Sequence, residues 1–437
     1  MSTVLVARPA PATPIPPAAS KLGPIRRATA LRHTSPGRLQ LVLAALLVLG
    51  VLTGLVAGLT ASSANASTTD LGNRAQPLLV EAESIYYGLA DADTTAAQAF
   101  LAGGLEPVAL TRRYEDDLTR ATTALTSAAR RTPDGSASAG AVSALSSGVS
   151  RYAALVATAR ADNRQGLPVG SSYLSAASQL NRDTLLPQAQ ELFRIAQREV
   201  RGGYTSARST WWLMLLVVLL VLLLLALVLA QRYLSRTTHR TFNVPLLAAT
   251  GLTVLLALGA GGILINQNVH LHRADVQGSA PAAVLAEGRI LALRERGDEA
   301  LALAAHGSGG AYESDFAAEQ KQLTASDGPL ASDYLPGDAV TAHQTYLDRH
   351  KQVRALDDGG DYDGAVKLAI GADTTKVFDT VTADIGTSLD QRKAAFTAEI
   401  DSAGSGLALL IVLGPLLALV ACALVAVGLR ARLEEYR

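Results

Sequence analysis

The sequence has a single cysteine, Cys422, and aromatic residues make up only 5% of its 437 positions. One cysteine excludes an intrachain disulfide, so the folded parts must be stabilised by their hydrophobic cores alone. Four long stretches contain no Asp, Glu, Lys or Arg at all. This absence argues against an ion or proton path through them, because such paths usually need ionisable groups.

The motifs of common nucleotide-dependent enzymes are also missing. There is no phosphate-binding loop, no GxGxxG between a strand and a helix, and no protein-kinase motif set. His270 and His272 would point to different faces of a helix, and His343 and His350 lie two turns apart without an acidic or cysteine partner. We therefore predict that these histidines lie on helix surfaces. We predict no catalytic residue, metal, cofactor or nucleic-acid partner, and we assign no ligand-binding residue.

Each charge-free stretch is long enough to cross a bilayer. The stretches are Leu39–Ala61, Trp211–Ala230, Val244–Ile265 and Gly406–Leu429. About 20 helical residues span a hydrocarbon core of roughly 30 Å, whereas a buried soluble helix of that length would carry a polar stripe. The pattern predicts an all-α membrane protein with four transmembrane helices. Ala64–Ala66 looks like a signal-peptidase site, but the apolar run before it is too long, so we expect an uncleaved anchor.

Basic residues gather beside the spans. Three short segments hold 12 basic and 2 acidic residues, whereas the two long loops hold 26 basic and 36 acidic residues. Because flanks rich in Lys and Arg stay in the cytoplasm, we predict a multi-pass protein of the cell membrane with both termini cytoplasmic. The predicted segments are a disordered basic Pro-rich arm (1–38), spans at 39–61, 211–230, 244–265 and 406–429, extracellular helical bundles at 62–210 and 266–405, a cytoplasmic hairpin (231–243) and a cytoplasmic tail (430–437).

The long loops have the pattern of packed helices. Apolar residues over 71–99 recur in alternating steps of four and three. This unbroken heptad seam predicts a helix that packs lengthwise against others. Further helices are predicted over about 107–131, 139–164 and 171–209, with Pro187 bending or restarting the last. Four antiparallel helices of this kind form an up-down bundle.

The second loop repeats the plan of the first. Tyr114–Leu118 (YEDDL) is echoed by Tyr312–Phe316 (YESDF), and the preceding Gly103–Gly104 is echoed by Gly309–Gly310. Any one echo is short enough to arise by chance, but their shared order favours duplication. We therefore predict two extracellular antiparallel four-helix bundles in a pseudo-duplicated span–bundle–span arrangement.

Small residues form ridges on two of the spans. Gly50, Gly54 and Gly58 make two overlapping GxxxG units, and Gly414 and Ala418 begin a similar ridge in the last span. Small residues allow helix backbones to approach closely in a membrane. We predict packing within one chain, with a homo-oligomer as the alternative.

A bundle whose end helices continue into spans can act as a lever, since packed helices slide between discrete arrangements. With little cytoplasmic mass, the output must pass to a separate protein, and Arg232, Arg236 and Arg240 of the hairpin are candidate docking residues. The arm either sets topology or docks on anionic membrane lipid or on a cytoplasmic partner. Arg112–Arg113 and Arg130–Arg131 either receive an acidic ligand or lie on a solvated helix face.

The whole chain resembles the GlnX-type membrane proteins of high-GC Gram-positive bacteria, with a basic Pro-rich arm, four spans, two similar helical outer domains and a small basic tail. The outer domains, with Tyr114–Leu118 and its echo, are similar to the four-helix-bundle sensor modules of chemoreceptors. The resemblance implies a relay between an extracellular glutamate/aspartate-binding lipoprotein and a cytoplasmic Ser/Thr protein kinase. The alternatives are a transporter-associated subunit that transmits force from an ATPase, and a passive envelope-anchoring protein.

Overall fold

The computed structural model describes residues 35–102, 106–207, 210–238, 243–305 and 307–434. Within these ranges every regular element is helical, including three short π-helical turns and one 3-10 turn. The predicted all-α class is therefore confirmed. Most of the predicted arm, the Gly103–Gly104 break and Arg240 lie outside the described residues.

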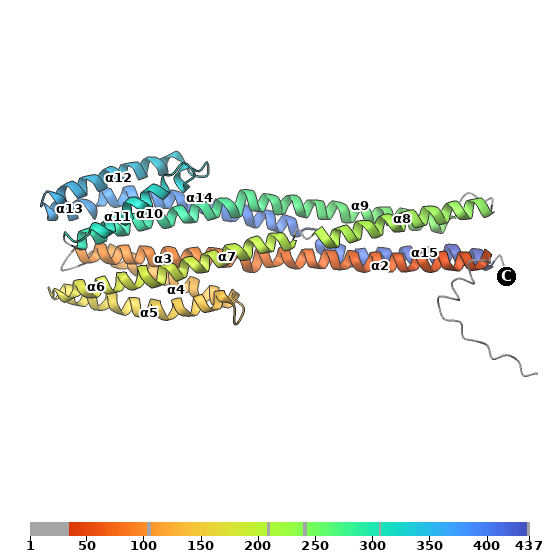
Figure 1. The fold of residues 1–437 in the computed structure, drawn as a ribbon, viewed down its shortest axis with the longest axis horizontal. Coiled ribbons are helices and arrows are strands. Elements are labelled where there is room, and N and C mark those ends of the chain that lie inside the picture. Colours follow the sequence, from red (N-terminus) through yellow and green to blue (C-terminus); the bar gives the residue numbers. More distant parts are fainter. Residues whose placement is uncertain (1–34, 103–105, 208–209, 239–242, 306, 435–437) are drawn as a thin grey trace, which may run out of the picture. The chain divides into compact units, whose positions relative to one another are not determined.

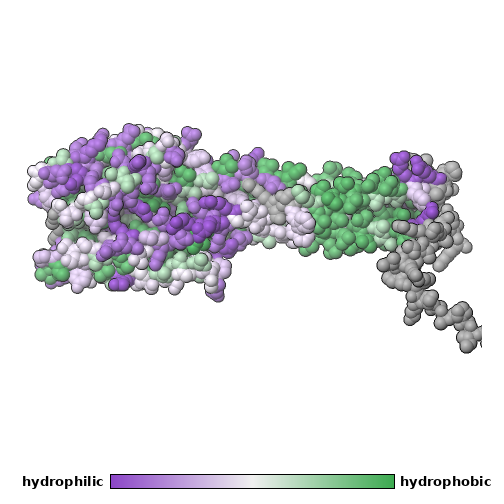
Figure 2. Space-filling view, viewed as in Figure 1, coloured by the Kyte–Doolittle hydropathy of each residue, from purple (hydrophilic) through white to green (hydrophobic). Residues whose placement is uncertain are grey.

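Four helices carry apolar stretches long enough to cross a membrane. Only 28–33% of each apolar window is buried within the protein, and Figure 2 shows the continuous hydrophobic surface that results. Soluble proteins rarely expose an apolar patch of this extent, whereas lipid covers it without cost. The prediction of four apolar helices able to span a membrane is thus confirmed. They lie in α2 (Ser35–Asp70), α8 (Thr210–Thr238), α9 (Val244–Arg273) and α15 (Leu407–Glu434).

Two of these helices extend well beyond their apolar stretches. The first runs without a break over Gly37–Leu101, and the third over Val244–Ala304. In each, a π-helical turn separates the apolar part from a more polar part. The parts are η1 (Leu71–Ala75) and α3 (Gln76–Leu101) in the first helix, and η3 (Ala274–Ser279) and α10 (Ala280–Ala304) in the third.

The chain forms two compact units. The span unit comprises Met1–Val56, Leu215–Leu258 and Leu413–Arg437, and the bundle unit comprises Ala57–Met214 and Gly259–Val412. Apolar side chains from α2, α8, α9 and α15, such as Leu46 and Leu227, form the core of the span unit.

The first bundle packs α3 against α4, α5 and the pair α6–α7 (Figure 1). Local signals set its turns: Gly135 takes a φ of 74°, and the Ser136 hydroxyl accepts from the Ala139 amide at 3.1 Å to cap α5. The predicted restart near Pro187 coincides with a π-helical turn that ends two residues earlier. The bounds are α4 (Val108–Arg131), α5 (Ala137–Arg164), α6 (Val169–Leu180), η2 (Asn181–Leu185) and α7 (Leu186–Ala207).

The second bundle repeats this order around α10. Tyr152 and Tyr346 are both fully buried, one in each bundle. The copies are not identical, since α11 has 14 residues where α4 has 24, and a break between α13 and α14 replaces the π-helical turn η2. The remaining bounds are α11 (Gly310–Leu323), η4 (Pro329–Ala331), α12 (Gly337–Asp358), α13 (Tyr362–Ala369) and α14 (Ala372–Gly404).

The two bundles share one hydrophobic core within the bundle unit. The first and third long helices run parallel there: Gln267 donates to the Thr68 hydroxyl at 3.1 Å, and a methyl group at Gly297 would lie 3.1 Å from Thr94 Oγ1. Because α3 has neighbours on nearly every side, 20 of its 26 residues are buried. The buried residues of α3 therefore include polar residues as well as the predicted apolar seam.

Candidate functional site

A cavity of about 600 Å³ lies between the two bundles, inside the bundle unit. Its walls come from α3 and the α6–η2–α7 segment of the first bundle, and from α10 and α11 of the second. A space of this size accommodates a small organic ligand. Four of the charged residues on its wall are acidic and two are basic: Asp93, Asp183, Asp315 and Glu319, with Arg182 and Arg294.

Arg182 reaches across the junction from η2. A π-helical turn inserts one residue into a helix and is often found at functional sites. The guanidinium pairs with Asp298 of α10, and its Nε lies 3.9 Å from Asp93 Oδ2. It also covers the ring of Tyr312, with its Cζ 5.2 Å from the ring centroid. Burial lowers the pKa of Arg182, but the two carboxylates outweigh burial and raise it, so the group stays charged.

Asp298 and Glu319 form a buried carboxyl pair at this junction, with exposed fractions of 1% and 9%. Burial, together with the neighbouring Asp298 carboxyl, raises the pKa of Glu319 to about 9. Burial also raises the pKa of Asp298, against the opposing effect of Arg182. At neutral pH the pair therefore shares a proton. Apart from that proton, no donor among the described residues reaches Asp298 Oδ2 or Glu319 Oε2.

Two further charged residues of the wall, Asp93 and Arg294, are held in place by neighbours. Asp93 Oδ1 accepts from the Ser178 hydroxyl at 2.9 Å and from the Tyr152 hydroxyl at 3.3 Å, and burial raises the Asp93 pKa. On the other side, Arg294 Nε lies 3.8 Å from Glu319 Oε1. Both arginines of the wall are thus already engaged by acidic residues.

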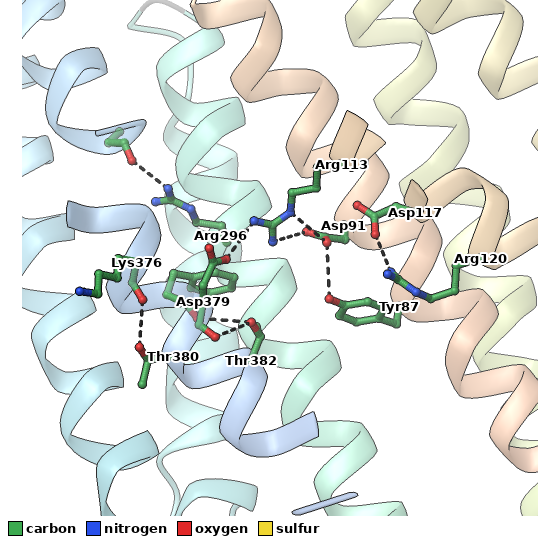
Figure 3. A network of polar contacts seen from close by, with 12 residues as sticks. Tyr87, Asp91, Arg113, Asp117, Arg120, Arg296, Lys376, Asp379, Thr380 and Thr382 are labelled. Atoms are coloured by element: carbon green, nitrogen blue, oxygen red, sulfur yellow. Dashed lines mark hydrogen bonds and ion pairs between the residues drawn. The ribbon is translucent and has the colours of Figure 1, made fainter. Parts of the chain in front are cut away.

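A second polar network joins the bundles through Arg113 of α4 (Figure 3). Arg113 Nη2 lies 3.1 Å from Asp91 Oδ1 of α3, and Nη1 lies 2.9 Å from Asp379 Oδ1 of α14. Burial and the nearby Asp91 carboxylate raise the pKa of Asp117 to about 8. The sequence left two interpretations of Arg112–Arg113 open, and the structure places Arg113 in an ion pair between the bundles.

Residues 67–205 match the family model of the actinobacterial sensor domain. The matched residues run from the last turn of α2 through the first bundle into the last turn of α7, and they include Asp93 and Arg182 of the cavity. The family is not an enzymatic one, and the match fits a sensor membrane protein of actinobacteria with a role in sensing or signalling. No curated protein and no solved structure matches the chain.

The prediction that the histidines are surface residues without acidic partners is wrong for the second bundle. His343 and His350 are 1% and 5% exposed. Their partners come from α10 and α11, so spacing within α12 did not reveal them. Among the described residues, no group of three or more His, Cys, Asp or Glu is suited to hold a metal ion. The pairs are His343–Glu295 at 2.7 Å, His350–Glu299 at 2.9 Å and His350–Glu313 at 3.0 Å, with His270–Glu399 at 2.6 Å as a further case.

The glycine ridge of α2 faces α15 in the span unit. A methyl group at Gly54 would lie 2.7 Å from Cβ of Ala418, and one at Gly50 would overlap the Cys422 thiol. Gly58 is half-buried and Gly414 is buried. The structure therefore brings Gly50 and Gly54 together with the small-residue ridge of α15 inside one chain.

Two of the three candidate docking residues lie near the C-terminal end of α8. Arg232 and Arg236 are exposed there, and Arg240 falls outside the described residues. Docking of a partner at these positions stays a prediction.

Sequence reasoning did not find the cavity residues. Asp93, Arg182 and Glu319 line the cavity and lie in separate segments, which only folding brings together. Asp298, the partner of Arg182, lies in a fourth segment. One signal was available: the seam helix of the sensor domain carries Asp93 near its centre, and its counterpart carries the run Glu295–Glu299 (ERGDE). Charges in the middle of a buried helix require partners and mark a candidate site.

Proposed function

We propose that this protein is a transmembrane sensor relay, in which occupation of the cavity shifts α3 against α10. The observation that carries the proposal is the position of the cavity between these two helices, each of which continues from an apolar span as Gly37–Leu101 and Val244–Ala304. A ligand that favours one packing of the two helices shifts the equilibrium between packings. Packed helices exchange between discrete arrangements, so the shift passes along each helix toward its span.

The sensor-domain match supports a sensing role for the first bundle. The charge distribution supports an outward position for both bundles, because the segments beside the spans are basic and the long loops are acidic. On this topology the output leaves the membrane through the hairpin, the arm or the tail, and a separate cytoplasmic protein receives it.

The resemblance to GlnX-type proteins suggests both partners: an extracellular glutamate/aspartate-binding lipoprotein and a cytoplasmic Ser/Thr protein kinase. The charge of the cavity supports a separate binding protein for a dicarboxylate ligand. Its wall carries four acidic and two basic residues, and both arginines are already paired. A dicarboxylate ligand would be repelled by the acidic residues of this wall. A lipoprotein that binds the dicarboxylate and docks on the bundles is therefore the better arrangement.

Crosslinking in intact cells, followed by identification of the captured proteins, tests the relay. We expect a solute-binding lipoprotein and a Ser/Thr kinase. Neutralising Arg232, Arg236 and Arg240 together should remove the kinase and leave membrane insertion intact. The matched control neutralises Arg194 and Arg198, exposed arginines of α7, and should leave kinase capture unchanged.

Three results would contradict this function. Capture of an ATPase in place of the kinase would favour a transporter-associated subunit. Capture of neither partner would favour a passive anchor. Loss of the kinase in the α7 control as well would remove the hairpin from its docking role.

A further inference from the structure

His350 of α12 connects three helices of the second bundle. Its Nδ1 lies 2.9 Å from Glu299 Oε2 of α10, and its Nε2 lies 3.0 Å from Glu313 Oε1 of α11. A carboxylate only accepts hydrogen bonds, and a neutral imidazole has a single N–H donor. Both contacts are therefore hydrogen bonds only when the ring carries two protons and a positive charge. His343 differs, because it contacts one carboxylate, Glu295, and the single N–H of a neutral ring satisfies that contact.

The surroundings of the two carboxylates decide which contact breaks when the ring loses a proton. Glu299 is 2% exposed, and Arg296 donates to its other oxygen at 2.5 Å, so Glu299 is fixed. The side chain of Glu313 is 38% exposed, and its Oε2 accepts no hydrogen bond from the described residues. Arg354 Nε of α12 lies 3.6 Å from that oxygen, and an arginine stays charged at any physiological pH. Glu313 can therefore turn from the ring to a more exposed partner whose charge does not depend on pH.

Phe316 forms a second contact between α11 and the ring of His350. The two rings are stacked, with centroids 3.8 Å apart and planes 11° from parallel. Phe316 follows Glu313 by three residues, so both side chains lie on one face of α11. A positively charged imidazole is attracted to the face of an aromatic ring, and a neutral one lacks this attraction. Both contacts of α11 with His350 therefore weaken when the proton leaves.

We propose that the second bundle senses the pH of the outer medium, with His350 as a latch that holds α11 when its ring is protonated and releases α11 when its ring is neutral. On release, the proton of Nε2 passes to solvent and Nδ1–H keeps its bond to Glu299. The inference rests on the proposed function only in the outward position of the bundle and in the role of α10, which continues into a span. Because α11 packs on α10, the latch controls a neighbour of that helix.

The charges around His350 set the direction in which the latch responds. Burial lowers the pKa of His350, but Glu299 and Glu313 outweigh burial and raise it. The latch is therefore closed at and below the ordinary histidine pKa of about 6.5, and it opens as pH rises through the higher pKa of the folded state. The charges that act most strongly on this pKa come from α10 and α11, not from α13 or α14. The charged groups at the latch are Glu295, Arg296 and Glu299 of α10, Glu313 of α11 and Arg354 of α12.

A spin-label distance measurement on the full-length chain in lipid nanodiscs tests the latch. In a Cys422→Ala background, Ala317→Cys on α11 and Gln352→Cys on α12 place labels at exposed positions. The distance between the labels should lengthen when pH is raised from about 6 to about 9, and it should recover when pH is lowered again. A distance that stays constant or shortens over this range overturns the inference.

Two variants assign the change to the latch. Glu313→Gln replaces the carboxylate by an amide, which both donates and accepts and so can bond the ring in either protonation state. The distance should then keep its low-pH value across the whole range. His350→Gln removes the titrating group and should abolish the pH dependence. A lengthening that persists in His350→Gln places the switch elsewhere and overturns the inference.

The controls separate the latch from other groups that titrate. Glu319 lies on the same helix, and burial, together with Asp298, raises its pKa to about 9, so Glu319→Gln is the matched control. His272→Gln alters an exposed histidine of α9. Both variants should keep the wild-type response, and its loss in Glu319→Gln would assign the movement to the cavity and overturn the inference. The measurement needs no partner protein, so the relay, which crosslinking tests, can survive failure of the latch.

Discussion

Two buried carboxyl groups keep their protons at neutral pH, and this sets the sign of the pH dependence of stability. Burial, aided by Asp91 and Asp298, raises the pKa of Asp117 to about 8 and that of Glu319 to about 9. In the unfolded chain both groups ionise near pH 4. Between these values the folded chain retains protons that the unfolded chain has lost, so the free energy of unfolding falls as pH rises.

We expect Tm of the full-length chain to fall steadily from pH 5 to pH 9. The buried His350 acts in the same direction: burial lowers its pKa, but Glu299 and Glu313 outweigh burial and raise it, so its stabilising charge is lost as pH rises. Asp117→Asn and Glu319→Gln imitate the protonated groups and should flatten the decline, whereas Glu287→Gln should keep the wild-type slope. A wild-type Tm that rises over this range would refute the assignment.

At the scale of elements, local signals made most helices predictable. The Pro133–Gly135 turn ends one helix, and Pro187 follows a real irregularity in another. The π-helical turns were not predictable, because they depend on packing rather than on local propensity. The turn η2 positions Arg182, so the cavity could not be predicted from the sequence either. The pairing of His343 with Glu295 could not be predicted, because the two residues lie on helices distant in the sequence. The same holds for the pairing of Arg113 with Asp379.

The contact between α2 and α15 allows a direct test of helix packing. Gly54→Leu would force the α2 backbone away from Ala418, and overpacking of this kind typically costs about 1–3 kcal/mol. The only cysteine of the chain, Cys422, lies on the same ridge and is buried, so it serves as a reporter. We expect faster labelling of Cys422 by N-ethylmaleimide and a lower Tm in the Gly54→Leu variant.

The control for this experiment is Gly251→Leu in α9. A Cβ atom at Gly251 meets no heavy atom within 4 Å, so the added side chain extends into open space. Labelling and Tm should stay at their wild-type values. If Gly54→Leu also leaves both unchanged, the close approach of α2 to α15 does not exist in the membrane.

At the scale of the whole molecule, the two bundles meet at two junctions that are not equivalent. The cavity lies where α10 and α11 of the second bundle face the α6–η2–α7 segment of the first. The equivalent place, with the roles of the two bundles exchanged, is where α3 and α4 of the first bundle face α14 of the second. That second junction is closed by Arg113, which pairs with Asp91 and Asp379. A symmetric dimer would carry two equivalent sites. This chain therefore presents one open cavity and one fixed contact between its bundles.

The relay requires that the bundles and the amino-terminal arm lie on opposite sides of the membrane. Three segments beside the spans hold 12 basic and 2 acidic residues, which favours a cytoplasmic location for all three.

In a Cys422→Ala background, Ser150→Cys on α5 and Thr341→Cys on α12 occupy exposed positions of the two bundles. Both should react with a membrane-impermeant maleimide in intact cells, whereas Ser20→Cys should react only after permeabilisation. If Ser20→Cys and Ser150→Cys label alike, no signal can cross between them. If only one bundle labels, the number of spans between the bundles is odd, and α3 and α10 cannot be neighbours in the membrane-embedded protein.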